Sequence, residues 1–380
     1  MKVWWPYLDL TRGLAALLVA SGHLRAFVFR DFNEVDHPSP FCYLFYFATG
    51  FGHQAVIVFF VLSGFLVGGA VLSRVKTAQW SWTDYAIMRV TRLWIVLIPA
   101  LLLTALWDHL GIVLTGSPFY TGELSSTYNI GPEADPSRYN IVSALGNLVF
   151  LQTIAVPTFG SNGPLWSLAN EFWYYVLFPL LFFSVTAKAK TFGKLGAAIA
   201  AFAICYMLPS SITISGSIWL LGVGAFALGS AVDLTLFLRR SLLVTSGATL
   251  AAALTLSRIS YLNGMIADVA IGATFSAMLV PLSQMRSVRP SIEKLSHAGA
   301  EFSYTLYLVH FPLAAFFACY VLQNRRLMPD LVSGAIYTGL LAIILIYAYG
   351  TYYLFERNTH TVRKAISAAF SHVRQWQCGH

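Results

Sequence analysis

Charged residues are scarce in this sequence. Asp, Glu, Lys and Arg make up 11% of its 380 residues, whereas 57% are hydrophobic and 15% are aromatic. An average soluble domain carries about 25% charged residues, so this composition excludes an ordinary soluble protein. The sequence instead predicts a polytopic membrane protein embedded in a lipid bilayer.

Cysteines and several catalytic signatures are missing or few. The four cysteines stand in unrelated segments without CxxC spacing: Cys42, Cys205, Cys319 and Cys378. Neither a disulfide framework nor a metal site is therefore predicted. The motifs HExxH and GxSxG and a P-loop do not occur, which leaves metalloprotease, serine hydrolase and nucleotidase functions without support. We predict no bound metal and no bound cofactor.

The net charge of +8 does not come from a cluster of basic residues. Basic residues stand singly or in pairs between apolar runs, which is typical of topology signals, so no nucleic-acid partner is predicted. The N-terminal run LAALLVASG follows Lys2 and could imitate a signal peptide. Asp9 and Arg12 interrupt its apolar core and many apolar runs follow, so we predict a retained first transmembrane helix.

Long apolar runs are what the sequence has in abundance. Eleven occur, at about 7–28, 46–72, 93–114, 141–157, 165–186, 195–209, 212–236, 241–257, 264–284, 301–323 and 330–355. The run 141–157 is short, holds Asn147 and Gln152, and precedes the turn-rich VPTFGSNGPLW, which favours a re-entrant or interfacial segment. We predict an all-α fold of about ten transmembrane helices plus this short segment.

Lysine and arginine positions favour one orientation. If 141–157 does not cross and the N-terminus is cytoplasmic, 17 basic residues lie inside and 6 outside. If 141–157 crosses, the counts become 8 inside and 15 outside. The positive-inside rule favours the first arrangement, with both termini cytoplasmic. The six outer residues are then Arg25, Arg30, Arg138, Arg258, Arg325 and Arg326.

Arg12 and His23 interrupt the first apolar run. Their eleven-residue spacing places them on one helix face, roughly 16 Å apart along the axis. Ionisable groups inside a membrane are costly, which makes a functional role the first hypothesis. The alternative is an Asp9–Arg12 ion pair at the helix end, with His23 reaching to the other interface.

Two further motifs suit a ligand. Arg89 and Arg92 in MRVTRLW share one helix face at the predicted cytoplasmic boundary. Paired guanidinium groups suit phosphates, although a topology signal or lipid headgroup contact explains them too. The earlier stretch Ser63, Gly64, Phe65 permits close backbone approach of a ligand, or simple helix packing.

Glu171 stands in the apolar stretch LWSLANEFWYYVLFP without a basic neighbour. Such a carboxylate must pair, protonate or bind a ligand. The predicted orientation gives it the depth of His23, where it could orient a general base, while a structural tie between helices is the alternative. Trp166 and Tyr174 in the same stretch are further candidates.

His310 in SYTLYLVHFPL is another candidate, although a lone buried histidine is more often a packing residue. Glu356 and Arg357 are expected to form a local ion pair at the end of the last helix.

Six motifs in order resemble the acyltransferase 3 family of integral membrane acyltransferases, many of which modify bacterial surface polysaccharides. They are LDLTRGLAALLVASGH, FFVLSGFL, MRVTRLW, LWSLANEFWYYVLFP, SYTLYLVHFP and YYLFER, and they cover nearly the whole chain. The resemblance implies a ten-helix fold, acyl-CoA as cytoplasmic donor and a sugar hydroxyl as outer acceptor. Asn358 departs from the family, which commonly has proline there.

The resemblance also implies roles for individual residues. It points to His23 as the catalytic residue, to Arg12, Arg89 and Arg92 as functional arginines, and to Glu171 as the family's acidic residue. We expect no esterase-like domain of the kind commonly fused to such enzymes, so acceptor recognition is expected to fall to the helices and outer loops.

These observations combine into one predicted enzyme. A transmembrane domain at 1–356 and a short basic cytoplasmic tail at 357–380 are expected in the bacterial inner membrane. His23 and Glu171 are expected to catalyse O-acyl transfer to a carbohydrate or glycolipid. Acetyl-CoA is the expected donor, with succinyl-CoA the other candidate. The donor is expected to contact Arg12, Arg89, Arg92, Ser63, Gly64 and Phe65.

Two other classes stay open at this point. A proton-coupled transporter of small molecules or polysaccharide precursors could use Arg12, His23 and Glu171 as a relay. It leaves the arginine pair unexplained, and no repeat of broken helices is visible in the sequence. A non-catalytic scaffold leaves all three intramembrane ionisable groups unexplained.

Overall fold

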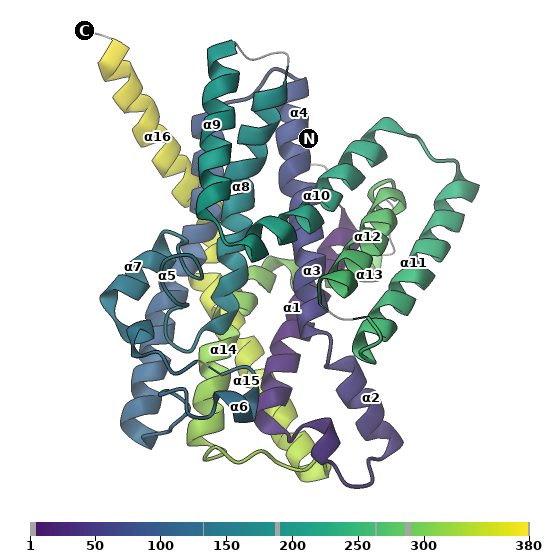
Figure 1. Ribbon diagram of the computed structural model, residues 1–380, viewed down its shortest axis with the longest axis vertical. Coiled ribbons are helices and arrows are strands. Elements are labelled where there is room, and N and C mark those ends of the chain that lie inside the picture. Colours follow the sequence, from purple (N-terminus) through teal and green to yellow (C-terminus); the bar gives the residue numbers. More distant parts are fainter. Residues whose placement is uncertain (1–4, 132, 187–190, 263, 286–289, 379–380) are drawn as a thin grey trace.

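The computed structural model describes residues 5–131, 133–186, 191–262, 264–285 and 290–378 (Figure 1). Over these ranges the chain is helical, and its β-type pairing is limited to the isolated bridges Phe29–Leu327 and Gln152–Val156. The all-α class predicted from the apolar runs is confirmed. Five basic residues used to predict the orientation lie outside the described residues: Lys2, Lys188, Lys190, Arg286 and Arg289.

The first half of the chain contains α1 (Pro6–Val28), η1 (Phe32–Glu34), α2 (Pro40–Ala48), α3 (Gly52–Ser63), η2 (Gly64–Gly68), α4 (Gly69–Lys76), α5 (Trp82–Thr115), α6 (Ser125–Tyr128), η3 (Pro136–Tyr139), α7 (Ile141–Leu148), η4 (Gly163–Leu165) and α8 (Trp166–Val185). The second half contains α9 (Thr191–Met207), α10 (Ser210–Ala231), α11 (Leu236–Arg258), α12 (Gly264–Ser283), α13 (Pro290–Glu301), α14 (Ser303–Tyr320), α15 (Leu331–Leu354), η5 (Glu356–Asn358) and α16 (Thr359–Cys378).

Seven helical segments in the described ranges are long and apolar enough to cross a membrane: Pro40–Lys76, Trp82–Thr115, Gly163–Val185, Ser210–Ala231, Gly264–Ser283, Ser303–Tyr320 and Leu331–Ala369. The chain is thus a multi-pass membrane protein. Helices α1 and α11, with 23 residues each, would span about 34 Å. Together with the shorter apolar α9 they would complete the ten predicted spans, a number that stays a prediction.

Residues 141–157 form a short non-crossing segment. Helix α7 has eight residues and would rise only about 12 Å, too little for a bilayer core. Asn147 donates to the carbonyls of Ser143 and Pro157, and its oxygen accepts from the Phe159 amide at 3.1 Å. Gln152 donates to the Leu165 carbonyl at 2.9 Å. These buried amides satisfy backbone groups that a broken helix would otherwise leave unpaired.

Helices α1 and α14 occupy the interior of the bundle. The segment Ser303–Tyr320 is apolar around its circumference, and 83% of it is buried, as expected for a helix enclosed by others. Helix α1 packs against α3, α13 and α14. In Figure 1 α16 and α2 lie at opposite ends of the long axis. The two central helices carry His23 and His310, so both histidines belong to the core of the molecule.

Candidate active site

Two adjoining cavities lie inside the bundle. One, of about 350 Å³, has Arg12, Ser63, Arg89, Arg92, Glu171 and Tyr175 among its lining residues, and we call it the arginine cavity. The other, of about 370 Å³, is lined by His23, His53, Asn129, Gly163, Trp166 and Phe311 among others, and we call it the histidine cavity. Arg12 and His23, predicted to share one face of α1, therefore open into different cavities. Val56 and Tyr307 line both.

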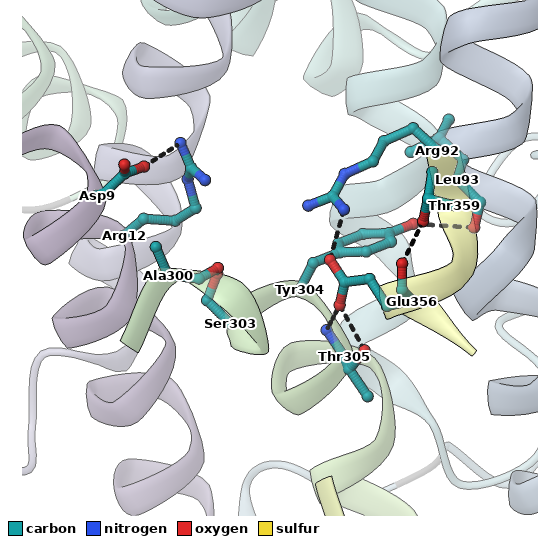
Figure 2. Close-up of polar contacts among 10 residues, drawn as sticks. All are labelled: Asp9, Arg12, Arg92, Leu93, Ala300, Ser303, Tyr304, Thr305, Glu356 and Thr359. Carbon is teal, nitrogen blue, oxygen red and sulfur yellow. Dashed lines mark hydrogen bonds and ion pairs between the residues drawn. The ribbon is translucent and has the colours of Figure 1, made fainter. Parts of the chain in front are cut away.

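The three arginines singled out in the sequence meet in the arginine cavity. Arg12 comes from α1, whereas Arg89 and Arg92 come from one face of α5. Figure 2 shows Arg12 and Arg92 on opposite sides of the same space. Arg12 also pairs with Asp9 at 3.1 Å, so the ion pair considered as an alternative exists alongside the cavity position.

Arg92 is held by a buried carboxylate. Its Nη1 lies 2.5 Å from Oε1 of Glu356, and its guanidinium lies over the Tyr304 ring at 5.2 Å. Glu356 also accepts from the amide and hydroxyl of Thr305 (Figure 2). The expected Glu356–Arg357 pair is therefore wrong. The Glu356 side chain is buried and forms its ion pair with Arg92 of α5. Arg357 is exposed and lies over the Tyr353 ring.

Arg89 has a different environment from Arg92. Its guanidinium lies over the rings of Tyr85 and Tyr175, at 5.5 and 5.6 Å from their centroids. Its buried Nε has no hydrogen-bond partner among the described residues. Arg89 lines the cavity and has no ion-pair partner among the described residues, so its guanidinium is available to an anionic ligand.

Glu171 belongs to the arginine cavity. It accepts a hydrogen bond from the Tyr175 hydroxyl, which also contacts Ser63 Oγ at 3.2 Å. The expected contact between Glu171 and His23 is not found in the described part of the chain. Helix α8 begins at Trp166, which lines the histidine cavity. Glu171 follows five residues later and therefore lies about 7.5 Å further along the helix axis.

The stretch after Ser63 serves helix packing. Ser63 lines the arginine cavity and accepts from Trp219 Nε1 at 3.1 Å. A Cβ at Gly64 would lie 1.9 Å from the Trp219 carbonyl oxygen, so glycine is required for the approach of α10. Phe65 is buried, with its ring between those of Trp5 and Phe226. Gly64 and Phe65 stand outside both lining sets, and the donor contacts expected of them lack support.

His23 pairs with His310. Its Nδ1 lies 2.9 Å from His310 Nε2, and the rings are parallel with centroids 5.2 Å apart. His310 Nδ1 lies 2.9 Å from the Leu306 carbonyl, which can only accept a hydrogen bond. His310 Nδ1 must therefore carry a proton. In the neutral pair His310 Nε2 accepts from His23 Nδ1, which leaves a lone pair on His23 Nε2.

The other aromatic candidates divide between cavity and core. Trp166 lines the histidine cavity together with His53, whose Nε2 lies 2.8 Å from an Asp268 oxygen. Tyr174 donates to the Ile212 carbonyl at 2.8 Å and packs against Trp219, so it ties α8 to α10. We infer that Tyr174 has a structural role.

Sequence reasoning missed Asp108. Like Glu171, Asp108 is a lone carboxylate in an apolar helix, and this feature could have identified it. Asp108 is buried on α5 and accepts from the amide and hydroxyl of Ser161, at 2.7 and 2.6 Å. The next residue, Asn162, donates to Thr104 Oγ1 and to the Leu308 carbonyl. These bonds fix the turn whose Gly163 and Pro164 line the histidine cavity.

Comparisons with known proteins give one finding. A family model described as an acyltransferase domain matches residues 5–360. No curated protein and no solved structure matches the chain. Among the described residues, no three His, Cys, Asp or Glu side chains gather in a way that could hold a metal ion.

Proposed function

We propose, from the premise that the chain belongs to the acyltransferase 3 family and is a membrane acyltransferase, that it moves an acyl group from cytoplasmic acyl-CoA to a hydroxyl of a surface or secreted glycan. Acetyl is the expected group, with succinyl as the other candidate. The observation that carries this proposal is the adjacency of a three-arginine cavity and a histidine-pair cavity. The family match favours an enzyme over the transporter that the sequence left open.

The arginine cavity suits the phosphates of coenzyme A. Guanidinium groups bind phosphate oxygens through charge-assisted, often bidentate hydrogen bonds. Arg89 has no ion-pair partner among the described residues, and the Arg92 side chain keeps 39% of its surface exposed despite its pairing with Glu356. With the phosphates at these arginines, the pantetheine arm would carry the thioester toward the histidine cavity.

His23 is suited to act as the general base. Its Nε2 lone pair takes the proton of the acceptor hydroxyl while that oxygen attacks the thioester carbonyl. The carbon–sulfur bond then breaks, and the departing thiolate takes the proton from the His23 imidazolium. His310 accepts from His23 Nδ1 throughout, so it holds the reactive tautomer and stabilises the charge that forms. In this scheme Glu171 belongs to the donor-binding arginine cavity, where it holds the Tyr175 hydroxyl by a hydrogen bond.

The histidine cavity offers contacts that suit a sugar. Trp166 supplies an aromatic face, and His53 and Asn129 supply hydrogen-bonding groups. In the predicted orientation this cavity belongs to the outer half of the protein, where a glycan would approach. Both termini would then be cytoplasmic in a bacterial inner membrane.

The test compares surface glycans from cells with and without the gene by mass spectrometry. We expect an acyl modification that requires the gene and is lost with His23→Ala. The matched control is His109→Ala, which removes an exposed histidine from α5 and should leave the modification intact. Glycans that are identical in the presence and absence of the gene would contradict the proposed acceptor.

A further inference from the structure

The linings of the two cavities share two residues. Val56 on α3 and Tyr307 on α14 are the residues that line both. Tyr307 is the larger of the two, and it is 8% exposed. It precedes His310 by three residues, so both side chains lie on one face of α14, with ring centroids 6.2 Å apart. The Tyr307 ring thus stands between the arginines and the histidine pair.

The hydroxyl of Tyr307 is held from both sides of this boundary. It lies 2.7 Å from Ser167 Oγ, which lines the arginine cavity, and 3.3 Å from the carbonyl of Pro164, which lines the histidine cavity. Its ring meets Phe59 edge to face at 5.8 Å. A side chain held by two hydrogen bonds can rotate out of the boundary and back, whereas backbone at this position could not.

We propose that Tyr307 is a gate between the arginine cavity and the histidine cavity, and that it selects donors with short acyl groups. This proposal rests on the proposed acyl transfer. When the pantetheine arm fills the arginine cavity, the Tyr307 ring turns aside and admits the thioester to His23. A small acyl group passes beside the ring, whereas a longer chain collides with it, so the gate favours acetyl over succinyl as the transferred group. Before the ring turns, it keeps outer water away from the thioester of the donor that is entering the arginine cavity.

Accessibility of introduced thiols tests the gate without any acyl transfer. All four native cysteines are replaced by serine. Gly163→Cys then puts a thiol in the histidine cavity, where a Cβ meets no atom within 4 Å. Ser63→Cys puts one in the arginine cavity. A membrane-impermeant maleimide is applied from the cytoplasmic side of oriented vesicles that hold the full-length protein.

With Tyr307 present, we expect cytoplasmic maleimide to label the Ser63→Cys variant but not the Gly163→Cys variant. Adding Tyr307→Ala should raise the cytoplasmic labelling rate of Gly163→Cys at least tenfold. Tyr307→Phe keeps the ring but loses both hydrogen bonds, so a smaller increase in labelling is expected. This variant tests the gate if Tyr307→Ala does not fold. The control is Tyr304→Ala, an aromatic on the same helix that lines the arginine cavity alone. Labelling that does not depend on Tyr307 would overturn the gate.

Donor selectivity provides the second measurement. Rates of acyl transfer to the surface glycan are measured with purified protein, and acetyl-CoA and butyryl-CoA are compared as donors. We expect Tyr307→Ala to raise the butyryl-to-acetyl rate ratio at least tenfold. It should also increase acceptor-independent release of CoA, because water then reaches the thioester. An unchanged ratio in a folded variant would overturn the selectivity.

The two measurements separate the two proposals. If the wild-type protein transfers no acyl group, acyl transfer fails, and thiol labelling still decides whether Tyr307 divides the cavities. If transfer occurs and labelling does not respond to Tyr307, acyl transfer stands and the gate is wrong.

Discussion

His23 donates from Nδ1 to a partner that itself donates to a backbone carbonyl, and this chain of contacts decides which ring nitrogen can act. Loss of the base and loss of its partner should therefore differ. We expect His23→Ala to lower acyl transfer at least a hundredfold, the usual scale of general-base catalysis. Alanine is well tolerated in an apolar helix, so insertion should persist.

His310 acts through His23 and is a positioning residue. We expect His310→Ala to lower kcat strongly with little change in the KM for acyl-CoA, because the donor site lies in the other cavity. His310→Gln should restore part of kcat, since its side-chain oxygen can accept from His23 Nδ1. A packing role would be indicated instead if glutamine and alanine were equally impaired while both proteins had wild-type thermal stability.

Arg89 and Arg92 allow the ligand and topology interpretations to be separated. Lysine keeps the charge but lacks the planar fork. If the arginines grip phosphates, each Arg→Lys change should raise the apparent Kd for acyl-CoA about tenfold, the effect of losing one charge-assisted bond. Affinity for the acceptor should not change. Arg74→Lys, on α4, is the matched control. Wild-type donor affinity in the double lysine variant would return the pair to a topology signal.

The same two arginines should differ in their effect on stability. Arg92→Ala leaves the buried Glu356 carboxylate without its cation, which typically costs about 3–5 kcal/mol. Arg89 has no carboxylate partner among the described contacts, so Arg89→Ala should lower the melting temperature much less. Thermal unfolding in detergent measures both, and Glu356→Gln should recover part of the loss in the Arg92→Ala background. Equal melting temperatures would contradict this assignment.

At the scale of elements, the connection between α7 and α8 is fixed by Asp108. Asp108→Ala removes both accepting oxygens, which leaves the Ser161 amide and hydroxyl without their partner. We expect a loss of about 1–3 kcal/mol and faster proteolysis between α7 and α8. The matched control is Asp84→Ala, exposed near the start of α5, which should have neither effect. Equal protease sensitivity in the two variants would contradict the anchoring role.

The limits of the sequence are clearest at this scale. Apolar runs and local polar residues predicted the all-helical fold and the short α7, because each is a local property. The grouping of Arg12 with Arg89 and Arg92 came only from the resemblance to a known family. The pairing of His23 with His310 joins residues 287 apart, and that of Arg92 with Glu356 joins residues 264 apart. Nothing local encodes such pairs. Glu171 was expected beside His23 because depth was judged from apolar boundaries, which are accurate only to a few residues.

At the scale of the whole molecule, the proposed direction of transfer requires the arginine cavity to face the cytoplasm. In Figure 1 α4 and α16 lie toward one end of the bundle and α2 toward the other. Arg74, Lys76, Arg363 and Lys364 lie on α4 and α16. The positive-inside rule therefore predicts that the end with α16 is the cytoplasmic one.

This orientation is tested by two glycines that have open space for an added side chain, Gly163 before α8 and Gly193 near the start of α9. In the protein without native cysteines, an impermeant maleimide should label Gly163→Cys only from outside and Gly193→Cys only from the cytoplasm. The reason is that α8 crosses once between them, whereas the eight residues of α7 cannot cross. The reverse pattern would put the arginines on the outer side, out of reach of cytoplasmic acyl-CoA, and the proposed donor would have to be abandoned.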